Sequence, residues 1–362
     1  MQTPLSTMKA MVTVGHGGYE QLHYRDVPVP QLRPGEVLLQ VLAAGMNNTD
    51  INTRVGWYGT PPAAGNASSA TGAQQTPSGW NGATPFPLIQ GADCCGRVVA
   101  VAEDVVDLPC VQSPKPGARV LVRSCMRVSG FDSPHTRWLG TDMPGAFAQF
   151  VAVSASEVFA VNCDWSDAQL ATIPCAYGTA ENMLQRAGVR AGERVLITGA
   201  SGGVGSAAVQ LALRRGAHVV AVTARSKRDD LHKLGAHEVL CREDDLLLQC
   251  AAESADVVVD NVAGAGFGQL LKLLKRGGRY VSSGAIAGAD VALDMRDLYL
   301  KDIALYGCTA WSASVFPDLI GYIERGEIKP LLAATYPLRD MALAQQNFLQ
   351  KQHIGNLVLL PD

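Results

Sequence analysis

The chain has 362 residues, of which 48% are apolar and 17% charged, and its formal net charge is −3 at pH 7. The length suggests two domains, and the composition excludes disorder as the general state of the chain. The weak negative charge argues against a nucleic-acid partner, and no apolar run approaches the roughly 18 residues of a membrane span, so we also expect no membrane partner.

The first 155 residues have the pattern of a small all-β module. Short β-like runs, broken by Pro and Gly, occur at residues 9–14, 36–45, 96–102, 118–123 and 147–153. Residues 59–87 interrupt this pattern, because they are rich in Gly, Ala, Ser, Thr and Pro and show no periodicity. We expect a long flexible loop there, which is either a lid over a site or a tolerated surface insertion.

Residues 156–314 alternate β runs with helical patterns. The runs VLITG, HVVAVT and DVVVDN are each followed by a helical stretch. This order predicts an α/β fold with a doubly wound parallel sheet. Residues 315–362 hold two helical runs and a closing strand at 356–361, which should return to the first module because a lone strand needs a sheet to join.

The strongest motif is RVLITGASGGVGSAAVQLA, residues 194–212. An apolar strand runs into a glycine-rich turn and then into an Ala-rich helix, which is the context of a pyrophosphate-binding turn. No Gly-Lys-Ser/Thr follows, so it is not a P-loop. A short-chain reductase is also excluded, because no tyrosine has a lysine four positions on. The turn residues predicted to bind the cofactor are Gly199, Ser201, Gly202, Gly203, Val204 and Gly205.

The second strand of this region indicates which dinucleotide binds. An NAD site places an acid at the end of this strand, whereas cationic side chains hold the 2′-phosphate of NADP. The strand here ends in Thr223, followed by Arg225, Ser226 and Lys227, and Asp229 and Asp230 come too late. These residues predict NADP(H); the alternative is a solvated basic helix start, which the helix dipole disfavours.

The nine cysteines are odd in number and scattered, with no Cys-x-x-Cys pair. This pattern is typical of reduced, buried thiols in a cytoplasmic protein. The N-terminus lacks the apolar core of a signal peptide, which agrees with a cytoplasmic location.

With these motifs the whole chain resembles the medium-chain dehydrogenase/reductase superfamily. The resemblance runs through PGEVLLQVLAAGMNNTD, GADCCGRVVAVAEDV, ATIPCAYGTAENML, the glycine turn and HIGNLVLLP. It implies a GroES-like β-barrel catalytic domain over residues 1–155 and 315–362, and a Rossmann NADP-binding domain over residues 156–314. It also implies that hydride passes in a cleft between the two.

Zinc-dependent members of that superfamily carry a Cys-His pair where Asn47 and Asn48 stand here, and a second His at the position of Ala92. Their structural zinc lobe needs four cysteines, and the matching region offers only Cys125. The chain therefore resembles the zinc-free quinone oxidoreductase and enoyl reductase-like branch, and we expect no metal. It departs from that branch at Asn52, where quinone oxidoreductases often carry a tyrosine.

The site residues implied by the resemblance fall into two groups. Asn47 and Asn48 would orient substrate oxygen or the nicotinamide, although both could instead be turn or cap residues. Tyr58 and Tyr177 are candidate proton donors, and Asp50 either caps the local helix or holds Arg54. Further cofactor contacts carried over from the family are Thr179, Asn261, Val262, Gly284, Ala285, Ile286 and Asn356.

The function expected from these residues is zinc-independent, NADPH-dependent reduction of a quinone or of the C=C bond of an enal or enone. An amide NH₂ stabilises the anion formed when such an acceptor takes hydride, and it needs no change of protonation. The alternatives are an alcohol or aldehyde dehydrogenase of the same superfamily and a non-catalytic, crystallin-like NADPH-binding protein. Relatives are commonly homodimers, often through a Rossmann edge strand such as residues 303–308.

Overall fold

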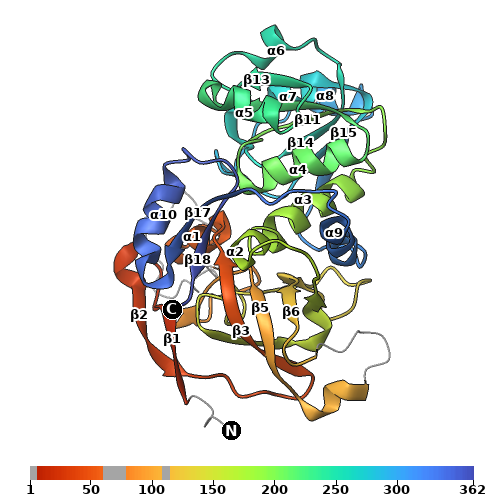
Figure 1. The fold of residues 1–362 in the computed structure, drawn as a ribbon. Coiled ribbons are helices and arrows are strands. Elements are labelled where there is room, and N and C mark those ends of the chain that lie inside the picture. The colour runs from red at the N-terminus through yellow and green to blue at the C-terminus, as the bar shows by residue number, and fades with distance from the viewer. Residues whose placement is uncertain (1–5, 60–78, 108–114) are drawn as a thin grey trace. The chain divides into compact units, whose positions relative to one another are not determined.

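The computed structural model describes residues 6–59, 79–107 and 115–362, and the chain forms two compact units (Figure 1). The first unit takes Met1–Pro174, Ala334–Gln350 and Leu357–Asp362, and the second takes Cys175–Ala333 and Lys351–Asn356. Most of the predicted 59–87 loop, residues 60–78, lies outside the described residues.

The boundaries of the two units differ from the domain limits at residues 155 and 315 that were expected from the sequence. Strand β10 (Val158–Ala160) pairs with β6 (Arg119–Val122), which draws the chain up to Pro174 into the first unit. Helix α9 (Val315–Glu324) buries Phe316 and Leu319 within the second unit. Local sequence patterns mark where strands and helices begin, but they do not show which sheet an element joins.

The first unit is built from antiparallel strands. Strand β1 (Thr7–Thr13) pairs with β2 (Leu22–Pro28) and with β4 (Leu88–Ile89). Strand β3 (Glu36–Gly45) is central to the second sheet, because β5 (Cys95–Val101), β9 (Phe150–Ser154) and β18 (Asn356–Leu360) all pair with it. The closing strand therefore returns to the first module, as the sequence predicts. These features are those of a GroES-like domain.

The alternation of side chains along these strands builds the core of the first unit. In β3, Val37, Leu39 and Val41 are buried, while Gln40 is exposed. They pack in one cluster with Val98, Val120, Val151 and Leu359 from neighbouring strands. The remaining α-helices and strands of the first unit are α1 (Asn48–Val55), β7 (Cys125–Met126), β8 (Arg137–Trp138), α2 (Asp167–Leu170), most of β17 (Leu332–Pro337) and α10 (Met341–Leu349).

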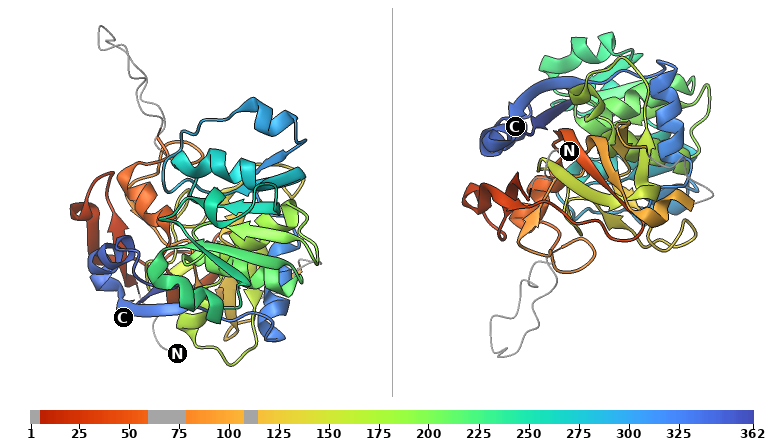
Figure 2. Two further views of the ribbon diagram at one scale, coloured as in Figure 1. Left: turned by 90° about the horizontal axis from the view of Figure 1, so that it is seen from above. Right: turned by 60° about the horizontal axis from the view of Figure 1, so that its bottom comes forward.

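The second unit contains one sheet of parallel strands in the order β13-β12-β11-β14-β15-β16. The strands are β11 (Arg194–Ile197), β12 (His218–Thr223), β13 (Glu238–Cys241), β14 (Ala255–Asp260), β15 (Leu274–Ser282) and β16 (Ala304–Gly307). Counted within this unit, the order is 3-2-1-4-5-6, which is the Rossmann order. Figure 2 shows the strands side by side with helices packed around them. The predicted doubly wound sheet is confirmed.

The strands of this parallel sheet are near-continuous apolar runs because helices cover the faces of the sheet. Val195, Leu196 and Ile197 of β11 are fully buried, as are Val257, Val258 and Val259 of β14. The helices of this unit are α3 (Pro174–Arg186, its first residue in the first unit), α4 (Gly203–Arg214), α5 (Arg228–Lys233), α6 (Leu246–Gln249), α7 (Phe267–Leu273), α8 (Met295–Tyr299) and α9.

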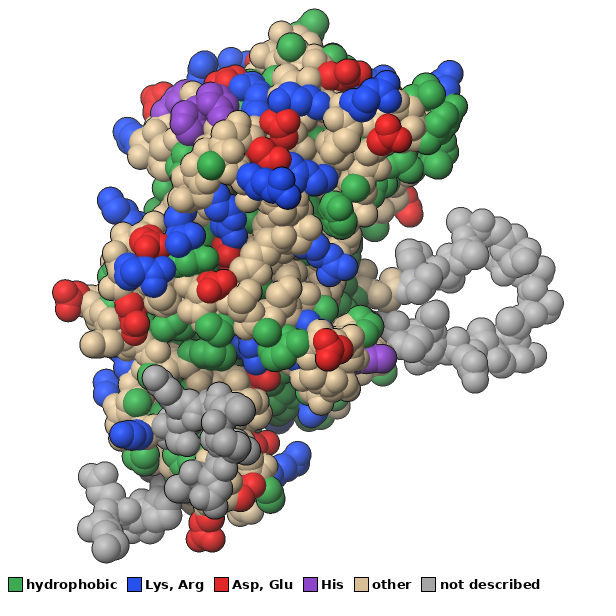
Figure 3. Space-filling view, turned by 90° about the vertical axis from the view of Figure 1, so that its right-hand side faces the viewer, with side chains coloured by type: hydrophobic (Ala, Val, Ile, Leu, Met, Phe, Trp, Pro, Cys, Tyr) green, Lys and Arg blue, Asp and Glu red, His purple; other side chains and the backbone are tan. Residues whose placement is uncertain are grey.

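On the face shown in Figure 3, basic and acidic side chains are interspersed, and no broad field of one sign appears. Among the helices of the described ranges, none has the length and apolarity required to cross a membrane.

Candidate functional site

The glycine turn joins β11 to α4 in the second unit. Gly199 has φ of +56°, a left-handed conformation that favours glycine. A Cβ on Gly205 would lie 2.2 Å from the carbonyl oxygen of Gly199, so the turn and the helix approach too closely for any side chain. Helix α4 starts after Gly202 without a side-chain cap. Its N-terminal N–H groups and positive dipole end are therefore suited to a phosphate.

A segment near the C-terminal end of the chain packs against this turn. The N–H of Gly355 donates to the carbonyl of Ser201 at 3.1 Å. The Asn356 side chain is 3% exposed and packs against Gly203. A Cβ on Gly203 would lie only 2.4 Å from Oδ1 of Asn356. The structure thus brings Asn356 together with the predicted turn, and Gly203 is required for that contact.

Two further segments predicted to contact the cofactor also lie together. Asn261 and Val262 follow β14, and Gly284, Ala285 and Ile286 follow β15. The N–H of Ala287 donates to the carbonyl of Val262 at 2.8 Å, and that of Ile286 to the carbonyl of Asn261 at 3.4 Å. The two loops leave the carboxyl edge of neighbouring parallel strands, which is the edge where such sheets bind ligands.

The end of β12 has an arrangement that the sequence did not predict. Arg225 is exposed, and its Nη2 donates to both carboxylate oxygens of Asp244, at 2.7 and 2.9 Å. Ser226 beside it is also exposed. Lys227 is 9% exposed, and its Nζ donates to the carbonyls of Lys351 and His353, both at 2.6 Å. Burial lowers the pKa of Lys227. Two of the three Nζ donors are therefore used by backbone carbonyls, which favours Arg225 over Lys227 as the ligand of the 2′-phosphate.

Two buried polar groups without partners test whether these residues fit a dinucleotide. Among the described residues, the Thr223 hydroxyl at the end of β12 and the Asn261 Nδ2 after β14 have no hydrogen-bond partner. Buried donors without partners are costly unless a ligand or water satisfies them. Together with the glycine turn, they fit the hydroxyl- and phosphate-rich surface of a nicotinamide dinucleotide. Thr179 is also buried, within α3.

Tyr177, in α3, does not have the environment of a proton donor. Its hydroxyl donates to the carbonyl of Lys329 at 2.5 Å and accepts from Nε2 of Gln210 at 2.8 Å. Burial raises the pKa of Tyr177. The hydroxyl is thus satisfied inside the second unit, which favours a structural role for Tyr177 over that of a proton donor.

Asn47 in the first unit connects two buried carboxylates. It is the N-cap of α1, and its backbone N–H donates to Oδ2 of Asp50 at 2.8 Å. Its side-chain Nδ2 donates to Oδ2 of Asp93 at 2.7 Å. The three residues are between 0% and 8% exposed. The asparagine is therefore both a cap residue and a side-chain amide held in one orientation.

Glycine makes this arrangement possible. Gly45, at the end of β3, has no Cβ, and a Cβ there would lie 2.5 Å from Oδ2 of Asp93 and 2.3 Å from the carbonyl of Ala171. Burial raises the pKa of Asp50 to about 7; the N–H of Asn47 acts against this rise, and the nearby Asp93 adds to it. Two carboxylates in one buried site disfavour a second negative charge.

Asp50 caps α1 but does not hold Arg54. The Arg54 guanidinium donates to Oε1 of Gln345, at 2.9 and 3.1 Å, and to the carbonyl of Gly17 at 2.6 Å. Of the two alternatives that the sequence left open, the cap is confirmed. Asn48 is the first residue of α1 and is half-buried.

Tyr58 belongs to a stack of aromatic rings beyond the other end of α1. Its ring stacks on Trp80 at 5.1 Å between centroids and meets Trp57 edge-on at 5.3 Å, and Trp80 stacks on Trp138 at 4.8 Å. Asn47 stands before α1 and Tyr58 after it, and this eight-residue helix is about 12 Å long.

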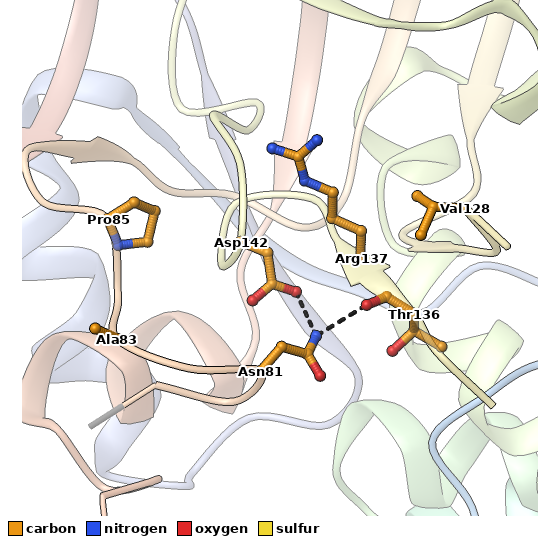
Figure 4. Close-up of a pocket in the computed structure, with 7 residues that line it drawn as sticks. All are labelled: Asn81, Ala83, Pro85, Val128, Thr136, Arg137 and Asp142. Carbon is orange, nitrogen blue, oxygen red and sulfur yellow. Dashed lines mark hydrogen bonds between the residues drawn. The ribbon is translucent and has the colours of Figure 1, made fainter. Parts of the chain in front are cut away.

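A surface pocket of about 310 Å³ adjoins the segments that carry Trp80 and Trp138. Asn81 spans it, and its Nδ2 donates to Oδ2 of Asp142 at 2.7 Å and to the carbonyl of Thr136 at 3.0 Å (Figure 4). None of the predicted site residues lines it; its lining is Asn81, Ala83, Pro85, Val128, Thr136, Arg137 and Asp142.

Within residues 6–59, 79–107 and 115–362, no three His, Cys, Asp or Glu side chains form a group that could hold a metal ion. Cys94 and Cys95 are buried, and burial raises the pKa of the Cys94 thiol to about 12 and that of Cys95 well above its usual value. They are inert thiols, and Cys110 lies outside the described residues.

Two buried acids were missed in the sequence, Asp93 beside Asn47 and Asp260 at the end of β14. Asp93 stands in the run GADCCG and Asp260 follows three valines in ADVVVD, and each is 0% exposed. An acid within a run predicted to be buried was the available signal, because such a group needs dedicated hydrogen-bond donors.

Comparison with known proteins gives matches along the whole chain. Residues 33–162 match the alcohol dehydrogenase GroES-like domain model, and residues 203–325 match the zinc-binding dehydrogenase model. The acryloyl-coenzyme A reductase of Metallosphaera sedula is 27% identical over 97% of this chain and 99% of its own length. The quinone oxidoreductase of Rattus norvegicus is 26% identical over 99% of this chain and 100% of its own.

Solved structures give the same picture. A proposed alcohol dehydrogenase from Sinorhizobium meliloti is 42% identical, covers 100% of this chain and 99% of its own, and superposes with a TM-score of 0.87. The quinone oxidoreductase from Coxiella burnetii is 25% identical, covers 98% of this chain and 100% of its own, and has a TM-score of 0.76.

Proposed function

The chain belongs to the medium-chain dehydrogenase/reductase superfamily, in its quinone oxidoreductase-like branch, and from this premise we propose a specific reaction. The protein is a zinc-independent, NADPH-dependent oxidoreductase that reduces a quinone or the C=C bond of an α,β-unsaturated carbonyl compound. The observation that carries the proposal is the buried amide of Asn47, held by Asp93 at the position where zinc-dependent relatives place a cysteine.

The cofactor would be held by residues of the second unit. The α4 N-terminus and the turn from Gly199 to Gly205 receive the pyrophosphate, and the unpaired Thr223 hydroxyl and Asn261 amide donate to the rest of the dinucleotide. When bound, NADPH supplies a hydride. The proposed preference for NADP(H) now depends on Arg225 and Ser226, because Lys227 is engaged elsewhere; Arg225 must then exchange Asp244 for the 2′-phosphate.

The acceptor chemistry follows from what Asn47 and Asn48 can offer. An electron-poor quinone or enone that takes hydride becomes an oxyanion, and preorganised N–H donors stabilise it without changing their own protonation. One Nδ2 proton of Asn47 is occupied by Asp93, which leaves the second proton as a donor to substrate oxygen. The Asn48 amide is proposed as a second group that orients this oxygen. The final proton comes from water or from Tyr58.

Zinc independence is proposed from the residue types. Amide and methyl side chains at Asn47, Asn48 and Ala92 provide neither thiolate nor imidazole, which are the ligands that zinc prefers. An alcohol oxidation would lose its usual Lewis acid in such a site, whereas an activated acceptor needs less help.

The assay that tests this function measures NADPH oxidation against a panel of quinones, enals, enones, enoyl thioesters and simple aldehydes. We expect turnover with quinones or conjugated carbonyl compounds and little with saturated aldehydes. Tight NADPH binding without turnover of any acceptor would support the crystallin-like alternative. Preferential turnover of alcohols or saturated aldehydes would instead support an alcohol dehydrogenase, the class to which the Sinorhizobium meliloti relative is proposed to belong.

We also propose a homodimer in the cytoplasm. The edge strand β16 of the second unit exposes Leu305, and the neighbouring α8 and its end expose Met295, Tyr299 and Leu300, all between 40% and 59% exposed. An apolar strand at a sheet edge is suited to pairing with a second copy. Size-exclusion chromatography with light scattering, on the native chain and on Leu305→Lys, tests this: the variant should shift toward the monomer mass.

A further inference from the structure

The second unit contains a buried carboxylate that no step of the proposed reaction uses. Asp260 is 0% exposed, and no Lys, Arg or His of the described residues forms an ion pair with it. Hydroxyls compensate its charge instead: Thr198 Oγ1 donates to Oδ1, and Tyr280 OH donates to Oδ2 at 2.5 Å. Burial is the main reason that the pKa of Tyr280 is raised, and the adjacent Asp260 adds to the effect. A buried charge with this many donors is specifically built, because it would otherwise be costly.

Asp260 stands at a special place in the sheet. It is the last residue of β14, and Thr198 directly follows β11. These two neighbouring strands are where the strand order reverses, in the series β13-β12-β11-β14-β15-β16. Open parallel sheets bind ligands outside the carboxyl ends of the strands at this switch point. The hydrogen bond between Thr198 and Asp260 spans this switch point, and the hydrogen bond from Tyr280 to Asp260 connects β15 to it as a third strand.

The same carboxylate shapes the loop that leaves β14. The N–H of Val262 donates to its Oδ1 at 2.9 Å, and the N–H of Ala263 donates to both oxygens at 3.1 and 3.2 Å. Ala263 has φ of +55° and ψ of −139°, which a residue with a Cβ rarely adopts. The carboxylate thus holds the loop in a conformation that it would not otherwise keep.

The loop held in this way fixes the side chain of Asn261. Ser283 Oγ donates to its Oδ1 at 2.6 Å, which identifies the opposite atom of the amide as Nδ2. That Nδ2 is buried and has no acceptor among the described residues. A donor that is fixed in orientation and lacks a partner, at the ligand edge of the sheet, indicates a missing acceptor.

We propose that Asp260 is a positioning residue of the cofactor site: through Thr198, Tyr280 and the loop after β14, it aims the Asn261 amide at an oxygen of the nicotinamide riboside half of the dinucleotide. This inference depends on the proposed function, since it assumes that a nicotinamide dinucleotide binds. It adds a residue that does not contact the cofactor and acts through Asn261.

The test compares two ligands on matched variants. NADPH contains both halves of the cofactor, whereas adenosine 2′,5′-bisphosphate contains only the half that would lie at the glycine turn and the end of β12. Thr198→Val removes one donor to Asp260 at nearly constant volume, and Thr198→Ser keeps it. Equilibrium binding of each ligand is measured by fluorescence, well below the unfolding temperature, together with binding to Asn261→Ala.

Thr198→Val and Asn261→Ala should weaken NADPH binding about tenfold and leave the bisphosphate unchanged, and Thr198→Ser should restore NADPH binding. A merely structural role would weaken both ligands or neither, and either result overturns the inference. If the native chain binds neither ligand, the proposed function itself fails. If the native chain binds both and the variants match it, only the role of Asp260 fails.

Discussion

The side-chain Nδ2 of Asn47 donates a 2.7 Å hydrogen bond to Oδ2 of Asp93, between two side chains that are 8% and 0% exposed. The carboxylate fixes which end of the amide is the donor, so Asn47 cannot rotate freely to suit another partner. Because Asp50 also accepts the backbone N–H of Asn47, one residue is held from two sides. The proposed function depends on this preorganised amide, and the following predictions test it.

Replacement of Asn47 should remove oxyanion stabilisation. Asn47→Ala is expected to lower kcat with a quinone or enone acceptor about 10²-fold, as the loss of one preorganised donor does elsewhere. Asn48→Ala, measured beside it, decides which of the two amides faces the substrate. NADPH binding and the unfolding temperature of both variants are measured in parallel. Equal activity of Asn47→Ala and the native chain would contradict a catalytic role.

The Asp50 and Asp93 pair should make stability depend on pH. The pKa of Asp50 is raised to about 7, so the folded chain keeps a proton that the unfolded chain loses above about 4. The free energy of unfolding therefore falls as pH rises from about 4 to 7 and then levels off. Asp50→Asn keeps an acceptor for the Asn47 N–H but carries no charge. Thermal unfolding from pH 5 to 8 should show a flatter profile for the variant; parallel profiles would refute the pair.

The end of β12 allows Arg225 and Lys227 to be separated. Arg225→Ala should weaken NADPH binding about tenfold and leave NADH nearly unchanged, since only NADPH has the 2′-phosphate. Lys227→Met should lower the unfolding temperature, because two backbone carbonyls lose their donor, and should affect both cofactors alike. Titration of both cofactors by fluorescence measures this. Equal losses of NADPH and NADH in Arg225→Ala would remove the argument for NADP(H).

Tyr177 should prove structural. Tyr177→Phe removes the donor to the Lys329 carbonyl and the acceptor for Gln210, which costs about 1 kcal/mol of unfolding free energy. The unfolding temperature should fall by a few degrees while kcat and its pH profile stay unchanged. A variant with native stability and a much lower kcat would return Tyr177 to the list of proton donors.

Much of the fold could be predicted from local patterns. The apolar runs ending at Ile197, Thr223 and Asp260 predicted parallel strands, and the glycines from 199 to 205 predicted the turn between the first strand and its helix. Periodicity and glycine chemistry are local properties, so a single sequence carries them. The domain limits were less accessible, because whether residues 156–174 join one sheet or another depends on the distant partner strand β6.

The candidate site was predicted less completely, and for the same reason. Lys227 has the charge and the position of a phosphate ligand, but its Nζ is held by carbonyls 124 and 126 residues away. Tyr177 stands in a matching motif, yet its hydroxyl is used by Lys329 and Gln210. Hydrogen bonds between distant segments decide which polar side chains remain available, and residue type does not reveal them.

The most direct test of zinc-independent reduction is the NADPH oxidation rate with a quinone or enone acceptor before and after exhaustive dialysis against a metal chelator, with the zinc content measured in both samples. The proposed function predicts an unchanged rate at a zinc content far below one ion per chain. A rate that is lost on chelation and restored by added zinc would contradict it.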